Sequence, residues 1–143
     1  MIEREPPGAR RGSVSVFRDG RGVLTLTDLA ALPFTPARAF VLHDVPAGAR
    51  RGGHAHRVQH EFLVVIAGRA RLVVDDGGGG EVVELGPGEA VHILPRVWHE
   101  LEALGEGLSV LVFAEGPYDP GDYVSEPPTL AAASAAAAQT RSA

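Results

Sequence analysis

Turn-forming residues interrupt the chain at short intervals, and this spacing is the strongest constraint on its fold. Eighteen glycines and eleven prolines divide 143 residues into short apolar segments. Several segments alternate apolar and polar residues, as residues 13–17 and 23–27 do, which is the pattern of a half-buried strand. Strands roughly 8–12 residues apart, separated by turn signals, are typical of an all-β sandwich or barrel. The sequence therefore predicts an all-β domain.

The chain divides into three parts. Residues 1–12 are polar and basic with two adjacent prolines, and we interpret them as a flexible arm. Residues 13–124 contain the predicted strands and form a single domain, which begins with a hairpin across residues 13–27. Residues 125–143 are a low-complexity tail that contains a nearly pure alanine run. Such a run has little to pack against, so we expect the tail to be loose.

Charge and residue usage exclude several classes of function. The formal net charge of -5 leaves no dominant basic face, so we expect no nucleic-acid partner. The absence of cysteine excludes disulfides, thiolate metal sites and cysteine nucleophiles. No apolar run approaches the roughly 18 residues that span a membrane, and the first residues lack an apolar signal segment. We expect a cytoplasmic protein with no membrane partner.

A histidine cluster is the strongest chemical signal in the sequence. Three of the six histidines fall between residues 54 and 60. His54 and His56 are two residues apart, so on a strand both side chains lie on one face. Two imidazoles directed at one point suit proton transfer or metal binding. Strict alternation would place Glu61 on the opposite face, but a turn through residues 57–59 would reset the register and direct Glu61 inward as well.

The spacing around these histidines resembles the cupin motifs. The first motif matches in full at Gly48, His54, His56, Glu61 and Gly68, and the second matches in part at Gly88, Pro95 and His99. Val97-Trp98 stands where the second motif has a glycine. The resemblance implies a cupin double-stranded β-helix, a jelly-roll barrel, with His99 as a further inward-facing residue. This fold agrees with the strand pattern.

A narrower resemblance connects the chain with the WxcM-like sugar 3,4-ketoisomerases. It rests on residues 51–57, 60–64, 73–77 and 95–100, of which His-Ala-His and Trp-His-Glu are the most specific. The resemblance implies an isomerase of deoxysugar biosynthesis that acts on a dTDP-linked 4-keto-6-deoxyhexose by proton transfer through an enediol or enediolate. It implies no cofactor, and a homodimer. His54 would remove the proton from C3 of the sugar, and His56 would relay protons or position the base.

The same resemblance implies the binding residues. Arg51, with Arg38 and Arg21, would bind the diphosphate or stabilise the enediolate. Trp98 would stack on the sugar or the base, and His99 and Glu61 would lie in the wall of the pocket.

Three departures from the ketoisomerase pattern keep alternatives open. Glu61 stands where that group has glutamine, and with His54, His56 and His99 it completes a set that binds a divalent transition metal in other cupins. Phe40 replaces a tyrosine of the group, and the sequence also differs after Tyr123. The alternatives are a metal-dependent cupin enzyme, a dioxygenase or an isomerase that uses those four residues, and a non-catalytic cupin that binds a small molecule.

Overall fold

The computed structural model describes residues 8–125, which form twelve strands and two short 3-10 helices. The elements are β1 (Ala9–Ser13), β2 (Ser15–Asp19), β3 (Gly22–Leu26), η1 (Leu29–Ala31), β4 (Arg38–Val45), β5 (Arg50–His56), β6 (Glu61–Ala67), β7 (Ala70–Asp75), β8 (Gly80–Leu85), β9 (Glu89–Ile93), β10 (Trp98–Ala103), β11 (Leu108–Ala114), η2 (Pro120–Asp122) and β12 (Tyr123–Val124). Within this range, neither helix has the length or apolar character needed to cross a membrane.

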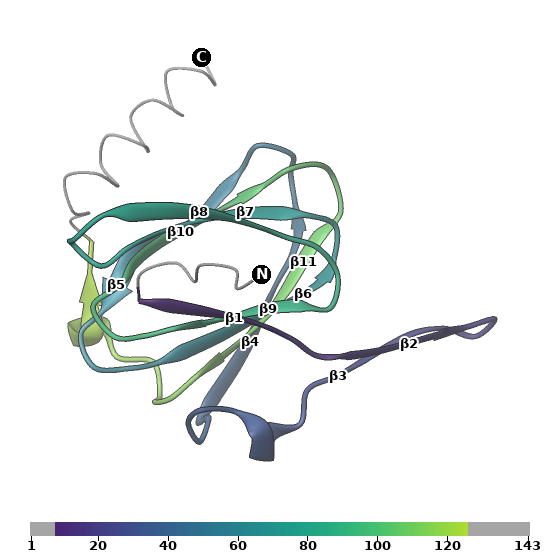
Figure 1. The fold of residues 1–143 in the computed structure, drawn as a ribbon, viewed down its shortest axis with the longest axis horizontal. Coiled ribbons are helices and arrows are strands. Elements are labelled where there is room, and N and C mark those ends of the chain that lie inside the picture. The colour runs from purple at the N-terminus through teal and green to yellow at the C-terminus, as the bar shows by residue number, and fades with distance from the viewer. Residues whose placement is uncertain (1–7, 126–143) are drawn as a thin grey trace, which may run out of the picture.

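Two antiparallel five-stranded sheets pack face to face (Figure 1). One has the strand order β1-β9-β6-β11-β4 and the other has the order β12-β5-β10-β7-β8. Strands far apart in sequence are neighbours in both sheets, because the chain crosses repeatedly from one sheet to the other. This topology is that of a jelly roll. The predicted all-β fold is confirmed.

The inward faces of both sheets form one apolar core. Alternate residues of each strand point between the sheets, as Leu108, Val110 and Val112 of β11 do, and all three are buried. Burial of an aliphatic side chain of this size contributes about 1.5–3 kcal/mol. Leu63 and Leu101 also belong to this core, and they form its boundary with the cavity described below.

The N-terminal edge of the domain differs from the prediction. The interpretation of residues 1–12 as a flexible arm is wrong for residues 9–12, which belong to β1 and pair with β9. Ala9 is buried opposite Ile93. The sequence of β1 has no alternating apolar pattern, because an edge strand is held largely by main-chain hydrogen bonds to its neighbour. Residues 1–7 and most of the predicted tail lie outside the described residues.

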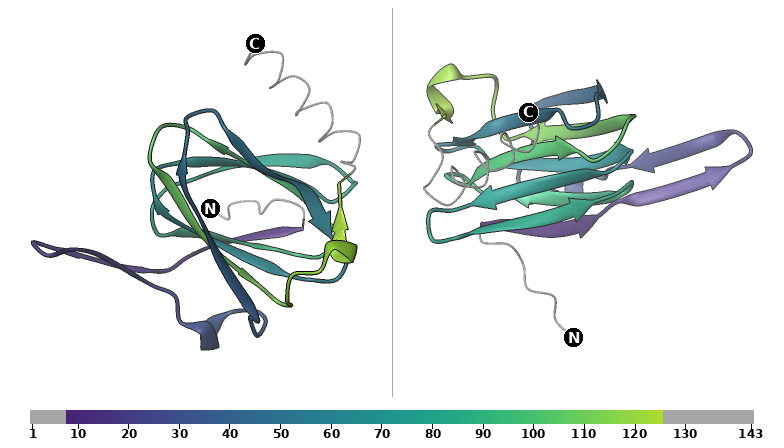
Figure 2. Two further views of the ribbon diagram at one scale, coloured as in Figure 1. Left: turned by 180° about the vertical axis from the view of Figure 1, so that it is seen from behind. Right: turned by 90° about the horizontal axis from the view of Figure 1, so that it is seen from above.

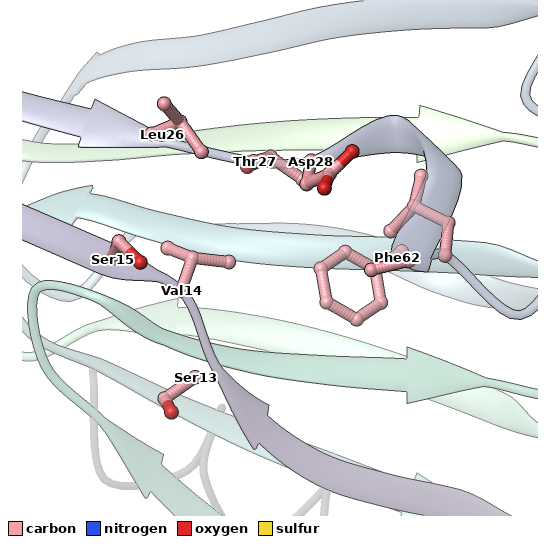
Figure 3. A pocket seen from close by; sticks show the side chains of 9 residues that line it. Ser13, Val14, Ser15, Leu26, Thr27, Asp28 and Phe62 are labelled. Carbon is pink, nitrogen blue, oxygen red and sulfur yellow. The ribbon is translucent and has the colours of Figure 1, made fainter.

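The predicted N-terminal hairpin is confirmed as β2 and β3, which pair from Ser15–Leu26 to Asp19–Gly22. It projects away from the two sheets as a separate two-stranded ribbon (Figures 1 and 2). A hollow of about 330 Å³ lies at its base, where Val14, Leu26 and Phe62 are among the lining residues (Figure 3).

Candidate active site

The histidine cluster borders a cavity of about 200 Å³ between the two sheets. Its walls come from six strands, and the lining residues are Phe40, Leu42, Arg51, Gly52, His54, Glu61, Leu63, His99, Leu101, Val112 and Tyr123. Its apolar side is continuous with the core, whereas its polar side consists of imidazoles, a carboxylate and a guanidinium. Such a mixture is typical of a small-molecule site.

Two glycines bring β5 close to β10 at the cavity. Gly52 and Gly53 have φ values of 92° and 75°, in the left-handed region that favours glycine. A Cβ atom on Gly52 would lie 3.1 Å from the carbonyl oxygen of His99. The register of the two strands shifts at this point, and beyond it His54 lies opposite His99, with 5.0 Å between the ring centroids. The glycines therefore position two of the candidate histidines.

Glu61 joins the cluster from the first position of β6. Its Oε1 atom lies 3.2 Å from Nε2 of His56 and 3.1 Å from Nε2 of His99. Its side chain is 4% exposed. The inward orientation predicted from a turn after His56 is confirmed, since residues 57–60 separate β5 from β6 and reverse the alternation.

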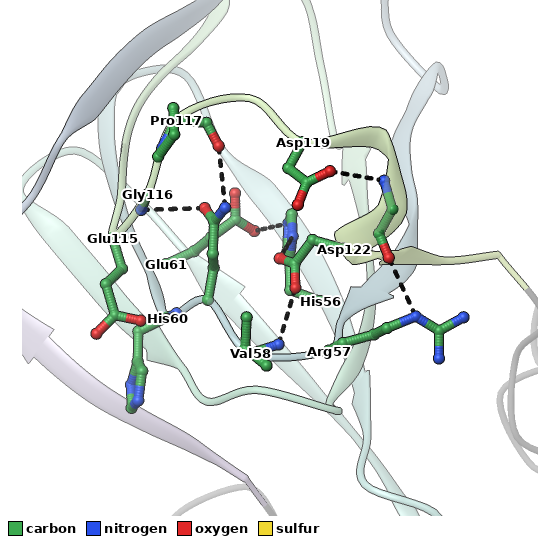
Figure 4. A network of polar contacts seen from close by, with 12 residues as sticks. His56, Arg57, Val58, His60, Glu61, Glu115, Gly116, Pro117, Asp119 and Asp122 are labelled. Carbon is green, nitrogen blue, oxygen red and sulfur yellow. Dashed lines mark hydrogen bonds and ion pairs between the residues drawn. The ribbon is translucent and has the colours of Figure 1, made fainter.

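Asp122 is a buried contact of His56 that the sequence analysis did not identify. Its Oδ2 atom lies 2.9 Å from Nδ1 of His56, and its Oδ1 atom accepts a 2.9 Å hydrogen bond from the amide of Val58 (Figure 4). The main-chain amide of Arg57 also donates to the carbonyl oxygen of Asp122 at 2.7 Å. The segment around η2 is thereby attached to the turn that follows the second histidine. No local pattern predicts a contact between residues 66 positions apart.

Tyr123, the residue after Asp122, lies in the cavity wall, and sequence reasoning gave it no role. It pairs with His56 through β12 and β5. Its ring centroid lies 4.8 Å from that of His54 and 4.6 Å from that of His56. The aromatic ring therefore packs against both imidazoles.

The cluster gives its members different protonation tendencies. Burial, together with the nearby charges of His99 and His56, lowers the pKa of His54 to about 4. Burial also opposes charge on His56, but its hydrogen bonds and attraction to Glu61 and Asp122 outweigh burial and raise its pKa. Burial alone would raise the pKa of Glu61, yet hydrogen bonds from His56 and His99 hold that pKa well below its usual range. A neutral imidazole thus lies beside an ion-paired network.

Comparison with known proteins places this site in a family. Residues 10–134 match the family model described as FdtA: WxcM-like, C-terminal. The chain belongs to this family. A curated relative, the TDP-4-oxo-6-deoxy-alpha-D-glucose-3,4-oxoisomerase of Aneurinibacillus thermoaerophilus, is 30% identical over 110 residues, which are 76% of this chain and 79% of the relative.

Solved structures of sugar 3,4-ketoisomerases share the fold. A mutant of the 3,4-ketoisomerase QdtA from Thermoanaerobacterium thermosaccharolyticum, in complex with TDP-4-keto-6-deoxyglucose, has a TM-score of 0.75 and 26% identity, covering 83% of this chain and 88% of that one. The WlaRB TDP-quinovose 3,4-ketoisomerase from Campylobacter jejuni has a TM-score of 0.74 and 25% identity, covering 82% and 92%. The predicted resemblance to sugar 3,4-ketoisomerases is confirmed.

Two of the three arginines implied by the family resemblance lie near the cavity. Arg51 lines it. The guanidinium carbon of Arg38 lies 5.6 Å from the ring centroid of Phe40 and 5.8 Å from that of Tyr118. Among the described residues, nothing accepts a hydrogen bond from its buried Nε and Nη2 atoms. Arg21 lies in the turn between β2 and β3, where it pairs with Asp19 at 2.6 Å, and it does not line the cavity of its own chain.

The role expected for Trp98 is contradicted. Its side chain is 3% exposed and packs against Ala55, Val73 and Val124, and it does not line the cavity. Neighbouring residues of a strand point to opposite faces, so the orientation that directs His99 inward directs Trp98 to the outer face of the sheet. Trp98 therefore anchors β12 against β5 and β10, and it does not stack on a ligand in this cavity.

Three of the four residues of the alternative metal set, His54, Glu61 and His99, are placed to bind a divalent transition metal, and His56 lies beside them. Ligand atoms of His54, Glu61 and His99 all lie within 4.8 Å of one another. Nδ1 of His99 is 3.1 Å from the carbonyl oxygen of Val97, which can only accept, and Nδ1 of His56 faces Asp122. Both rings therefore direct Nε2 toward Glu61, as ligating histidines do when the other ring nitrogen donates to a carbonyl or carboxylate.

Proposed function

We propose that this protein is a sugar 3,4-ketoisomerase that acts on a TDP-linked 4-keto-6-deoxyhexose, as its FdtA relatives do by name. The observation that carries the proposal is the pairing of His54, a neutral imidazole in the cavity wall, with the ion-paired cluster of Glu61, His56 and Asp122. Proton transfer within a sugar needs a base in a site that also stabilises the developing charge.

The reaction moves hydrogen along the sugar without net oxidation. The ketone at C4 acidifies the proton on C3, and His54 accepts that proton while its C–H electron pair forms the C3–C4 double bond. The former ketone oxygen, O4, receives a proton to give an enediol. Loss of the O3 proton and return of a proton to C4 then give a 3-ketone with a hydroxyl at C4. C3 is oxidised while C4 is reduced within the same molecule, so the step requires no redox cofactor.

Positive charge near the cavity supports this assignment. Negative charge grows on O4 as the C3 proton leaves, and fixed cations nearby stabilise it. Arg51 lies in the wall of the cavity, and Arg38 has two buried donors without an acceptor among the described residues. These guanidiniums would bind the diphosphate or the enediolate oxygen. His56 acts from behind the wall, because it contacts Glu61 but does not line the cavity.

Incubation with the TDP-linked 4-keto sugar in deuterated water tests the proposal. The wild type should produce the 3-keto sugar and incorporate deuterium, and His54→Asn should abolish both while the far-ultraviolet circular dichroism is unchanged. His43→Asn is the matched control, because His43 is an exposed histidine of β4 outside the cavity. Binding without exchange or product in the wild type would instead indicate a non-catalytic module. Full exchange in His54→Asn would mean that another residue is the base.

A divalent transition metal is a second candidate element of this site, favoured by the convergence on Glu61. His54, Glu61 and His99 would hold it, with His56 beside them. Such an ion would supply Lewis-acid polarisation of the substrate oxygens. Elemental analysis of purified wild type and Glu61→Gln decides between the two forms. About one ion per chain that is lost in the variant supports a metal enzyme, whereas turnover by metal-free wild type supports direct acid–base catalysis.

We also propose that the protein is a homodimer in which the β2–β3 hairpin contacts the second copy. Phe17, Val23, Leu24 and Leu26 of this hairpin are between 48% and 59% exposed. An isolated two-stranded hairpin is marginally stable in water, so apolar side chains on such a ribbon need a covering surface. A second copy would supply that surface and would bring Arg21 toward the cavity of the partner.

A further inference from the structure

We propose that Asp122 is a positioning residue for the isomerisation: it fixes the ring of His56, which in turn holds the carboxylate of Glu61 at the cavity wall. The inference rests on the proposed function. It assigns a role to the short segment after β11, which contains η2 and β12.

Both oxygens of Asp122 have partners, and the side chain is 2% exposed. Oδ2 lies 2.9 Å from Nδ1 of His56, and Oδ1 accepts a hydrogen bond from the amide of Val58. A carboxylate buried to this extent costs several kcal/mol unless it is paired and hydrogen-bonded. The position of Asp122 is therefore set by these two contacts, which together align the segment with the end of β5.

The contact continues through His56 to the cavity. With Nδ1 directed at Asp122, Nε2 of His56 lies 3.2 Å from Oε1 of Glu61, an ion-pair contact without hydrogen-bond geometry. The same oxygen contacts Nε2 of His99, whose Nδ1 is anchored on the Val97 carbonyl. Glu61 is thus held from two sides, by one histidine anchored on a carboxylate and one anchored on the main chain. A flip of the His56 ring would break this arrangement on one side.

The position of Glu61 matters because this residue lines the cavity next to His54, whereas His56 and Asp122 do not. A displacement of about 1 Å in a reacting site can lower a rate about 100-fold. Without the Asp122 carboxylate, Nδ1 of His56 loses its acceptor and the ring can rotate. Glu61 then loses one of its two supports. The effect should appear in turnover more than in substrate binding, because neither Asp122 nor His56 lines the cavity.

The fold allows this role to be separated from a structural one. The main chain at Asp122 remains attached when its side chain changes, because the amide of Arg57 donates to its carbonyl oxygen and β12 pairs with β5. Asp119 is a matched control in the same segment. Its side chain accepts the amide of Gly121 at 2.9 Å, and it is exposed.

The experiment compares Asp122→Asn and Asp122→Glu with Asp119→Asn. We expect Asp122→Asn to lower kcat about 10–100-fold with KM within about twofold of the wild type, Asp122→Glu to recover part of the loss, and Asp119→Asn to match the wild type. Long-range 1H–15N spectra of the imidazoles report the proton on Nδ1 of His56 directly. That signal should be present in the wild type and in Asp119→Asn, and altered in Asp122→Asn.

Unchanged kcat in Asp122→Asn, or equal losses in both asparagine variants, would overturn the positioning role. If Asp122→Asn did not fold, a wild-type spectrum without a proton on Nδ1 of His56 would overturn it, and one with that proton together with partial activity in Asp122→Glu would support it. Failure of the proposed function is distinguishable, because it would appear as absence of turnover in the wild type itself. The spectra would then still decide whether Asp122 fixes the ring.

Discussion

His54 and His56 point from the same face of β5, yet their surroundings separate their chemistry. His54 lies in the cavity wall, where burial and the nearby His99 and His56 lower its pKa to about 4 and so keep it neutral at neutral pH. His56 lies behind the wall between two carboxylates, where charge is favoured. One histidine is suited to accept a proton, and the other to hold its neighbours in place. Identical residues two positions apart therefore have different functions.

The pKa of His54 predicts the acid limb of the pH profile. A base acts only when it is unprotonated, and the pKa of His54 is lowered to about 4. As pH falls from 8, kcat/KM should therefore stay level through the ordinary histidine range near 6.5 and should decrease with a midpoint of about 4. Steady-state kinetics between pH 8 and about 4, with circular dichroism at each point to confirm folding, provides the measurement. A midpoint near 6.5 would contradict this assignment of the base.

At the residue scale, the sequence predicts the members of the cluster that follow a fixed spacing. His54, Glu61 and His99 could be placed together from the cupin pattern, because that spacing reflects two neighbouring strands and one turn. Asp122 could not, because its contact with His56 depends on how the chain returns after β11. Trp98 was assigned to the cavity from its neighbour His99, but adjacent residues of a strand lie on opposite faces.

At the element scale, local patterns predict hairpins better than edge strands. β2 and β3 alternate and are joined by a short turn, so their pairing is encoded within residues 15–26. The pairing of β1 depends on β9, which lies about 80 residues away, and its arginines and glycine carry no apolar pattern. The need for two glycines in β5 could not be predicted from local sequence, because it arises from the close approach of β10 across the strand pair.

The turn before β10 contains a strained residue that predicts a stabilising substitution. Arg96 has a φ of 68°, and its amide donates a 2.6 Å hydrogen bond to the carbonyl oxygen of His56. A non-glycine residue in this region costs about 1–2 kcal/mol, which glycine would relieve. Glycine also makes the unfolded chain more flexible, and this offsets part of the stabilisation. Arg96→Gly should therefore raise the free energy of unfolding by about 0.5–1 kcal/mol in urea titrations.

Arg71→Gly is the control for this effect. Arg71 is part of β7 and is not among the positive-φ residues of the described chain, so glycine there removes side-chain contacts without relieving strain. This control should be less stable than the wild type. A loss of stability in Arg96→Gly would show that its side chain contributes more than its backbone costs.

At the scale of the whole molecule, the two sheets enclose a complete core whereas the hairpin does not. Phe17 pairs with Leu24 across β2 and β3, and these side chains are 59% and 56% exposed. If a second copy covers them, the wild type should have twice the 15.0 kDa mass of the chain in light scattering. The double substitution Phe17→Ser with Leu24→Ser should give a folded monomer.

Val82→Ser is the control for the hairpin substitution. Val82 is about as exposed as Phe17 and Leu24, but it lies on β8, in the five-stranded sheet that also contains β5 and β10. This variant should remain a dimer. A monomeric wild type, or a hairpin variant that still dimerises, would refute the proposed contact. The sequence alone could predict the hairpin but not its exposure, because exposure depends on where the ribbon leaves the domain.

Mixed dimers test whether Arg21 serves the cavity of the partner. Arg21→Ala and His54→Asn chains should each be inactive alone, the first for lack of the guanidinium from its partner and the second for lack of the base. When they pair, the Arg21→Ala chain keeps His54 and receives Arg21 from the other chain, so one of the two cavities is complete. Random mixing of equal amounts should therefore restore about one quarter of wild-type turnover. If the mixture recovers no activity, Arg21 does not act in the cavity of the partner. If Arg21→Ala alone is fully active, Arg21 has no role in the mechanism.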